Sequence, residues 1–539
     1  MKPSAIKKVF GIISYFPNND SEYHKKTRKE RSRRFRELLL KLDELWPDVD
    51  IMIIAQNWQD FQLPDIRNKI IQYDYAKLGI LGARRELRKK FLESDYDYLI
   101  MLDDDGMITT EDPSIYMSEI DKHPDGMGVI RRTGCPLMLL AISKYVYSRI
   151  DMPDMDAEAD GGFEDDLFVA TCFAKLPDRC FDFPEGCITE TSFRYKGVGM
   201  CPSSWAGEKK RDWDYLRNFT DRKIYEVQHS ELFEDLNAPV EPSIDLLITY
   251  VNSGDQSWVR EYIKKTKTHN PSAVRFRSWG TLKYLLRGVD KYMPFIRKVV
   301  LIVASESQVP AWINPDKVRI VYHRDFIPQK FLPTFNSCTI ESFFWNIPDL
   351  ADRVIYVNDD MFPLNPMHEI DFFTGDVPHI RFKDPEKYNN RNVFVSQSRS
   401  GLNMITNALN LPKYPENKVL LPYHISQAIT RRGLDAVKEK CGVALESTVT
   451  YIRTATNVNQ YIYAYYLYFT DDYINLTVNY KYFDITDALF ADITDAILHK
   501  DYQMICLNDS DRLKDYNRTR YLLCNCFEKK FPNPSKYEL

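Results

Sequence analysis

The chain has 539 residues, of which 44% are hydrophobic and 28% charged, and this length predicts at least two domains rather than one hydrophobic core. Its formal net charge of -5 excludes a general nucleic-acid binder, which would carry a basic surface. No run of 18 apolar residues occurs, and the short run Val9–Phe16 is not a secretory signal, so we expect a cytoplasmic protein without a transmembrane helix.

Strand-like and helix-like segments alternate through the first 360 residues, which is typical of α/β folds with largely parallel sheets. In chain order, predicted strands cover Lys8–Phe16, Asp50–Ala55 and Tyr98–Leu102. A basic segment, Lys25–Leu38, predicts a solvated helix face. Peripheral contact of this segment with the anionic inner face of the cell membrane is the alternative.

The third predicted strand ends in three aspartates. The segment LGILGARRELRKKFLESDYDYLIMLDDDGM, residues 78–107, gives a glycine-bearing turn, a basic helix, a strand and an acidic end. It resembles the nucleotide-binding half of GT-A glycosyltransferases, especially family-2-like ones. The resemblance implies that Arg84 lies near the nucleotide, and that Asp103 and Asp105 hold Mg²⁺ or Mn²⁺ on the donor diphosphate. The cation is needed because carboxylates and diphosphate would otherwise repel each other.

A later segment, DGGFEDDLFVATCF at residues 160–173, is similar to the acidic motif before the acceptor-side helix of such enzymes. The resemblance implies that Asp165, or Glu164 beside it, is the base that deprotonates an acceptor hydroxyl. His229 fits the position of a third metal ligand. The resemblance covers about residues 5–230, and a domain that binds sugar without catalysis is the alternative.

Two prolines and several polar residues without periodicity predict a linker at Glu234–Ser243. We therefore expect domains at residues 1–236 and 243–539, each built on a Rossmann-like, mixed or parallel sheet. From about residue 400 helical periodicity predicts a helical part. The elements predicted before it are strands Ile244–Val251, Val299–Ala304, Val318–Tyr322 and Arg353–Val357, and helices Trp279–Tyr292 and Ser337–Trp345.

The segment RVIYVNDDM, residues 353–361, places Asp359 and Asp360 at the carboxyl end of a predicted strand, where open α/β sheets bind ligands. Two adjacent carboxylates repel by roughly 4 kcal/mol at 4 Å and an effective dielectric near 20. A divalent cation, Mg²⁺ or Mn²⁺, would neutralise the pair beside a phosphate-bearing substrate. An exposed turn with two aspartates is the alternative.

Further segments surround this pair in the sequence: IDLLITYVNSGDQSW at 244–258, RFRSWGTLKYLL at 275–286, LPTFNSCTIESFFWNIPDL at 332–350, YIRTATNVNQYIYAYYLY at 451–468 and ICLNDSDR at 505–512. In this order they resemble the conserved regions of the Stealth family of hexose-1-phosphoryl transferases, over about residues 243–539. That family includes bacterial capsule polymerases. The resemblance implies transfer of a sugar-1-phosphate from a nucleotide-sugar to a glycan hydroxyl.

The resemblance also implies roles for single residues. Glu341 and Asp360 would be active-site carboxylates, with Asp359 beside them, and His424 and Arg453 would be catalytic or phosphate-binding. A cation on Asp360 and Glu341 would bridge phosphate oxygens, Arg453 would stabilise the transition-state charge, and His424 could accept the acceptor's proton. In isolation, His424 would be read as structural. The implied substrate-binding residues are Asp245, Asn252, Asp255, Arg275, Arg277, Arg287, Arg391 and Arg399.

The sequence thus predicts a bifunctional capsule or exopolysaccharide polymerase that uses nucleotide-sugar donors and a free or lipid-linked glycan acceptor. The second domain would transfer sugar-1-phosphate and release a nucleoside monophosphate, and the first would form a glycosidic bond. One alternative keeps only the phosphotransferase active and lets the first domain bind the acceptor. Another is a non-enzymatic polysaccharide-binding component.

Overall fold

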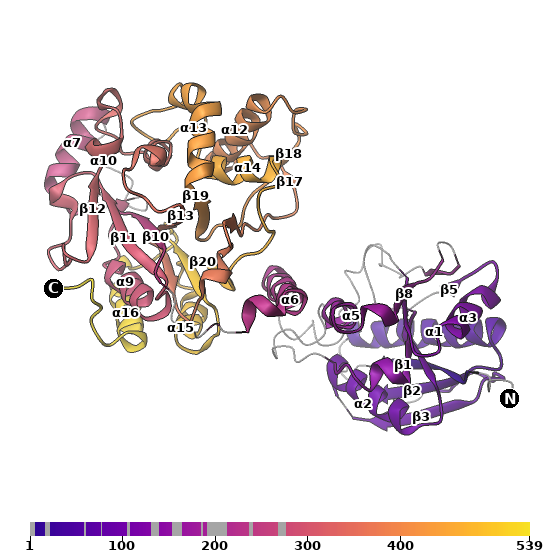
Figure 1. Cartoon of the computed structure of the whole chain (residues 1–539). Coiled ribbons are helices and arrows are strands. Elements are labelled where there is room, and N and C mark those ends of the chain that lie inside the picture. Colours follow the sequence, from indigo (N-terminus) through magenta and orange to yellow (C-terminus); the bar gives the residue numbers. More distant parts are fainter. Residues whose placement is uncertain are drawn as a thin grey trace. The chain divides into compact units, whose positions relative to one another are not determined.

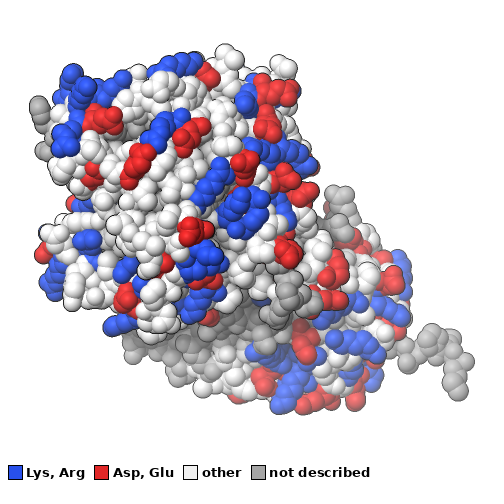
Figure 2. Space-filling view, turned by 60° about the vertical axis from the view of Figure 1, so that its left-hand side comes forward, with Lys and Arg blue, Asp and Glu red and all other residues white. Residues whose placement is uncertain are grey.

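A computed structural model of the chain describes residues 6–16, 22–58, 61–76, 78–104, 108–130, 139–152, 164–184, 187–190, 213–234, 236, 241–267 and 276–539. The chain forms two compact α/β units, Met1–Glu234 and Asp235–Leu539. Figure 2 shows Lys and Arg side chains interspersed with Asp and Glu on the face in view, without a field of one sign. Within the described ranges, no helix is both long and apolar enough to span a membrane.

The N-terminal unit is built around a mixed sheet. In its described part, seven strands pair in the order β3-β2-β1-β4-β7-β6-β8, and the first four of these are mutually parallel. The strands are β1 Lys8–Tyr15, β2 Asp50–Gln56, β3 Ile70–Tyr75, β4 Tyr98–Asp103, β6 Met127–Val129, β7 Leu140–Ser143 and β8 Cys180–Asp182, with β5 Ile108–Thr109 and β9 Thr189–Glu190 paired separately. The helices are α1 Glu22–Leu45, α2 Ile80–Glu93, α3 Pro113–Lys122, α4 Lys144–Tyr147, α5 Glu164–Lys175 and α6 Trp213–Gln228.

Alternation along these strands builds a core on each face of the sheet, because successive side chains point to opposite sides. Phe10 of β1 packs in one cluster with Phe35 of α1 and residues of α3. Val9 packs in the other with Leu87 of α2 and residues of α4 and α5. Figure 1 shows helices on both sides of this sheet. The unit is therefore a three-layer α/β structure, as the sequence predicts.

The C-terminal unit is built around five strands in the order β12-β11-β10-β13-β19, of which only β19 is antiparallel. The strands are β10 Ile244–Thr249, β11 Ile296–Val303, β12 Val318–Tyr322, β13 Arg353–Asn358 and β19 Gln427–Thr430, with a second sheet of β14 Met361–Pro363, β20 Tyr480–Asp484 and β21 Met504–Asn508. The helices are α7 Gln256–Thr266, α9 Leu282–Tyr292, α10 His323–Phe326, α11 Ser337–Glu341, α12 Val393–Ala408, α13 Arg431–Glu446, α14 Tyr461–Phe469, α15 Phe490–His499 and α16 Tyr516–Lys530. Short pairs are formed by β15 Phe373–Thr374 with β16 Val377–Pro378 and by β17 Glu386–Lys387 with β18 Lys418–Val419.

Helices cover both faces of the five-stranded sheet. Val354 and Tyr356 of β13 pack in one core cluster with residues of α12, α13 and α14, which lie together in Figure 1. On the other side α9 packs against α16, with the rings of Tyr284 and Phe527 stacked at 5.4 Å. Gly288 of α9 lies so close to β14 that an added Cβ would come within 2.4 Å of the Pro363 carbonyl. This contact brings the strand that follows the Asp359-Asp360 turn against the helical layer.

The predicted strands occur within three residues of their expected ends, but two expectations are wrong. The predicted helix over Ser337–Trp345 ends at Glu341 and is followed by a 3₁₀ turn, Phe344–Asn346. The part after residue 400 is not only helical, because β19, β20 and β21 lie within it. Strands of four or five residues, such as the fully buried QAIT of β19, show no alternation that a sequence pattern can detect.

Candidate active site

The C-terminal ends of the parallel strands β10 and β13 carry the polar groups on which the candidate site is built. Thr249 of β10 and Asn358 of β13 pair in register. The hydroxyl of Tyr356 lies 3.1 Å from Thr249 Oγ1 and 2.7 Å from Asn358 Oδ1. The same hydroxyl lies 3.2 Å from a carboxylate oxygen of Glu341. A buried tyrosine thus connects the strand ends to the predicted active-site glutamate.

Glu341 ends α11, and its side chain is almost fully buried. Its second carboxylate oxygen accepts a hydrogen bond from the backbone N–H of Gln460 at 3.0 Å, and the Tyr463 hydroxyl donates to its backbone carbonyl at 2.8 Å. Burial raises the pKa of Glu341, and the positive charge of Arg453 opposes that shift. The ionised carboxylate therefore depends on the nearby guanidinium.

Arg453 lies in the loop between α13 and α14, and its charge acts on Glu341. Its guanidinium contacts the hydroxyl of Ser337, the first residue of α11. Asn457, which is 1% exposed, organises the loop. Its amide nitrogen donates to the carbonyl of Thr448 at 2.6 Å, and its amide oxygen accepts from the N–H of Thr454 at 2.7 Å. The backbone beside Arg453 is thus fixed by a buried side chain.

Asn336 joins this loop to α11. It is fully buried and caps the helix by accepting a hydrogen bond from the N–H of Cys338 at 3.1 Å. Its amide nitrogen donates to Asn457 Oδ1 at 3.0 Å. The two asparagines therefore set Arg453 relative to Glu341. Neither was singled out from the sequence, since a buried asparagine has no pattern that separates it from a polar loop residue.

His424 lies in the segment that leads into β19. Its Nδ1 is 3.0 Å from the hydroxyl of Tyr461 in α14, and its Nε2 has no hydrogen-bond partner in the described part of the chain. Burial lowers the pKa of His424 to about 4, and the positive charges of Arg453 and Lys383 act in the same direction. The ring is neutral at pH 7. If Nδ1–H donates to Tyr461, Nε2 keeps a lone pair that can accept a proton.

Asp359 and Asp360 form the turn between β13 and β14. Burial, with the neighbouring Asp360, raises the pKa of Asp359 to about 8, and burial raises that of Asp360 to about 7. Asp360 Oδ1 is buried and lacks a hydrogen-bond partner among the described residues. Within those residues no three His, Cys, Asp or Glu side chains form a ready metal site. The two carboxylates, with the unpartnered Asp360 oxygen, are a donor set that would suit Mg²⁺ or Mn²⁺.

Arg277 and Asp509 form an ion pair next to this turn. Arg277 Nε donates to an Asp509 carboxylate oxygen at 2.6 Å, and its Nη2 contacts the other oxygen and the Ser510 carbonyl. The negative charge of Asp509 contributes to the raised pKa of Asp360. The backbone N–H of Leu507 also donates to the Asp360 carbonyl at 2.9 Å. Arg277 is therefore at the site, but it faces a carboxylate that the sequence did not single out.

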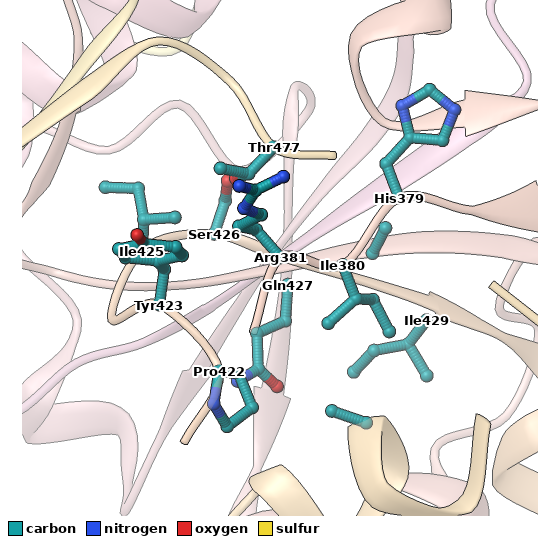
Figure 3. Close-up of a pocket in the computed structure, with 12 residues that line it drawn as sticks. His379, Ile380, Arg381, Pro422, Tyr423, Ile425, Ser426, Gln427, Ile429 and Thr477 are labelled. Atoms are coloured by element: carbon teal, nitrogen blue, oxygen red, sulfur yellow. The ribbon is translucent and has the colours of Figure 1, made fainter. Parts of the chain in front are cut away.

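A small cavity lies beside the His424 segment (Figure 3). Its lining includes Pro422, Tyr423, Gln427 and Arg381, and both amide atoms of Gln427 are buried without a partner among the described residues. Its volume is about 10 Å³, room for one water molecule. The cavity is too small for a sugar or a nucleotide, so it is not a substrate-binding pocket.

Three of the predicted substrate-binding residues have structural roles instead. Asp245 lies at the opposite end of β10, is 0% exposed, and accepts hydrogen bonds from Arg297 at 2.9 and 2.7 Å. Arg287 is bound by Glu538 at 2.8 and 2.9 Å. Arg399 donates to three backbone carbonyls, at 2.6 to 2.9 Å. Each charge is already paired inside the protein, so none is available to a ligand at the strand ends.

The other predicted residues lie at the edge of the site or outside it. Asn252 and Asp255 follow β10, where Asp255 caps α7. Burial alone would raise the pKa of Asp255, but hydrogen bonds donated by Ser257, Ser307 and Gln308 outweigh it and leave that pKa well below its usual range. Arg391 is exposed before α12, and Arg275 lies outside the described residues.

In the N-terminal unit, Asp103 ends β4, and its carboxylate is 3.8 Å from the guanidinium of Arg84 in α2. Asp104, which the sequence did not single out, is 1% exposed, accepts from Ser14 at 2.7 Å and pairs with Arg31 of the basic segment at 2.6 Å. Asp105 and the side chains of Glu164 and Asp165 lie outside the described residues. His229 Nδ1 lies 3.1 Å from the Tyr225 carbonyl.

Comparison with known proteins gives matches to part of the chain. Stealth protein CR2, conserved region 2, matches residues 275–380, a range that includes Glu341, Asp359 and Asp360. The capsular polysaccharide phosphotransferase WcwK of Streptococcus pneumoniae is 28% identical over 333 residues, which are 98% of that protein and 55% of this chain. The exopolysaccharide phosphotransferase cps2G of Lactiplantibacillus plantarum is 39% identical over 137 residues, 40% of that protein and 25% of this chain.

Solved structures match less closely. TarS of S. aureus (residues 1–349, in complex with UDP-GlcNAc) matches with a TM-score of 0.29 and 12% identity, over 43% of this chain and 73% of that chain. A TM-score this low carries no argument about this chain. WcwK is covered almost completely by about half of this chain, so the rest has no counterpart in that relative. The match to Stealth conserved region 2 falls within the C-terminal unit.

Proposed function

We propose that the C-terminal unit is a polysaccharide phosphotransferase, which moves a sugar-1-phosphate from a nucleotide-sugar to a hydroxyl of a capsular or extracellular glycan. The observation that carries this proposal is the convergence of Glu341, Arg453, His424 and the Asp359-Asp360 turn from separate segments around the ends of β10 and β13. A polysaccharide-binding component would not need this set. The names of the relatives support the same class of reaction.

In the proposed reaction the acceptor oxygen attacks the phosphorus that bears the sugar, and the bond to the nucleoside monophosphate breaks. His424 Nε2 accepts the hydroxyl proton, because the ring is neutral at working pH. Arg453 stabilises charge on the transferring phosphoryl group, and Ser337 and the Asn457-organised loop hold Arg453 in place. Asp359 and Asp360 would hold Mg²⁺ or Mn²⁺, which when bound neutralises phosphate charge.

For the N-terminal unit we propose glycosyl transfer from a second nucleotide-sugar. Asp103 at the end of a parallel strand, with Arg84 beside it, supports this proposal. A unit that only binds the acceptor is the alternative. We place both reactions on the cytoplasmic side, where nucleotide-sugars are made, with a glycan that is free or lipid-linked at the inner membrane face.

The test separates the two products. Purified full-length chain is incubated with fluorescent oligosaccharide acceptors, Mg²⁺ and a panel of nucleotide-sugars. Nucleoside monophosphate reports phosphotransfer, and nucleoside diphosphate reports glycosyl transfer. Asp360→Ala should abolish only the first product and Asp103→Ala only the second. Undiminished monophosphate release by Asp360→Ala would refute the assignment of the C-terminal site.

A further inference from the structure

Tyr482 is an exposed aromatic side chain that stands beside the candidate base. Its side chain is 39% exposed, although it belongs to a paired strand, β20. Its ring centroid lies 6.0 Å from that of His424, with the two planes at 68°. The ring of Phe394 lies 5.6 Å from the same imidazole. The imidazole therefore contacts both rings, and the ring of Tyr482 is open to solvent.

The position of Tyr482 follows from the second sheet. In register across it, Tyr482 pairs with Cys506, and Cys506 pairs with Met361, the residue directly after Asp360. Side chains in register across neighbouring strands lie on the same face. The tyrosine thus extends from the sheet that begins at the carboxylate turn, and its ring lies on the site's side of that sheet.

The ring of Tyr482 is also held rigidly. Its hydroxyl donates to Asp484 Oδ1 at 3.1 Å. Asn508 donates to the same carboxylate at 2.9 Å, and Arg512 donates to its other oxygen at 2.7 Å. A tyrosine used only for packing would bury its ring. The hydroxyl of Tyr482 is held by Asp484, which Asn508 and Arg512 fix in turn, and its ring is partly exposed, so it is preorganised for a flat apolar surface.

We propose that Tyr482 forms the subsite for the sugar ring that carries the acceptor hydroxyl. The inference rests on the proposed function, because His424 Nε2 must be approached by that hydroxyl. A pyranose has an apolar face of C–H bonds, and the electron-rich face of an aromatic ring attracts it. With Tyr482 at 6.0 Å from the imidazole, a sugar ring that stacks on the tyrosine lies beside the base that would accept its hydroxyl proton. The donor is held elsewhere, by Arg453 and the carboxylate turn.

The first experiment measures sugar contact directly. Saturation-transfer difference NMR is recorded on the full chain with methyl β-D-glucopyranoside, methyl β-D-galactopyranoside and methyl 2-acetamido-2-deoxy-β-D-glucopyranoside at millimolar concentration. Transfer to ring C–H protons should fall at least threefold in Tyr482→Ala and Tyr482→Leu and persist in Tyr482→Phe. The leucine variant keeps apolar bulk without a ring, and it guards against a folding defect in the alanine variant. Tyr521→Ala, at a 67% exposed tyrosine of α16, should behave as wild type.

The second experiment uses monophosphate release with a fluorescent oligosaccharide acceptor. Tyr482→Ala should raise the acceptor KM about tenfold and leave the donor KM within twofold, since one aromatic contact accounts for about one order of magnitude. Equal saturation transfer in wild type and Tyr482→Leu, or no transfer to any glycoside in wild type, would overturn the subsite. So would a rise in donor KM alone, which would place the nucleobase on the tyrosine. If the Tyr482-dependent sugar signal is present but no monophosphate is released, the proposed function fails while the subsite stands.

Discussion

Replacing Asp360 with asparagine should stabilise the metal-free protein at alkaline pH and abolish phosphotransfer. In the wild type, burial holds the pKa of Asp360 at about 7 and, with the adjacent carboxylate, that of Asp359 at about 8. An acid whose folded pKa is raised favours its protonated form in the folded state. Its contribution to stability is complete below the unfolded pKa near 4 and is lost progressively as the pH rises from there through the folded pKa values of about 7 and 8.

The magnitude follows from the size of the shift. A rise from 3.8 to about 7 is about three pH units, or roughly 4 kcal/mol at 1.36 kcal/mol per unit. Asp360 is partly exposed, and its titration is coupled to that of Asp359. Screening by solvent and this coupling reduce the free energy below about 4 kcal/mol. We expect Asp360→Asn to gain about 2 kcal/mol of unfolding free energy at pH 8.5 and less than about 1 kcal/mol at pH 5.

Calorimetric melting in EDTA at the two pH values measures this gain and separates the transitions of the two units. Asp316→Asn, at an exposed aspartate of the same unit, is the matched control and should be neutral at both. If Asp360→Asn melts at or below the wild-type temperature at pH 8.5, the two carboxylates do not destabilise the site, and the argument for a cation there fails.

Three further predictions concern other parts of the molecule. Asn457→Ala should lower kcat for monophosphate release at least tenfold with donor KM within threefold, because Arg453 loses its fixed backbone; an unchanged kcat would contradict this positioning role. The acid limb of kcat/KM assigned to His424 should lie near pH 4, since burial lowers that pKa, and the limb should vanish in His424→Gln; a midpoint near 6.5 would show a solvated ring. Asp104→Ala should lower the stability of the N-terminal unit by about 3 kcal/mol, because it removes the buried partner of Arg31; an unchanged melting temperature of that unit would contradict a structural ion pair.

Seven strands of the two main sheets, β1, β2, β4 and β10 to β13, were predictable because buried parallel strands are continuous apolar runs with sharp ends. Tyr98–Leu102 and Arg353–Val357 each end in acidic residues, and the structure places those residues at the strand ends, as expected. The alternation of strands and helices was also enough to predict the α/β class. The short strands β19, β20 and β21 could not be predicted, because they are fixed by pairing with distant partners rather than by their own pattern.

Site residues could be predicted where they lie in segments that resemble a known family. Whether such a residue binds a ligand or stabilises the fold could not always be predicted. Asp245 and Arg287 lie in segments that resemble the family. In the structure, however, Asp245 forms an ion pair with Arg297, and Arg287 forms one with Glu538. A sequence shows a charge but not its partner across the fold. Asn336 was missed for the opposite reason, since its importance lies entirely in contacts with a loop more than a hundred residues away.

The distance in sequence between contacting residues also sets when this unit can become active during its synthesis. Arg277 is held by Asp509, and Asp360 receives its backbone hydrogen bond from Leu507. Long-range contacts form slowly, and here the partner must first leave the ribosome. The N-terminal unit can fold while the second is still being made, whereas the carboxylate turn waits for residues 507–509. A nascent chain would therefore show an unfinished site for most of its translation, and slower, cooler expression should raise the active fraction.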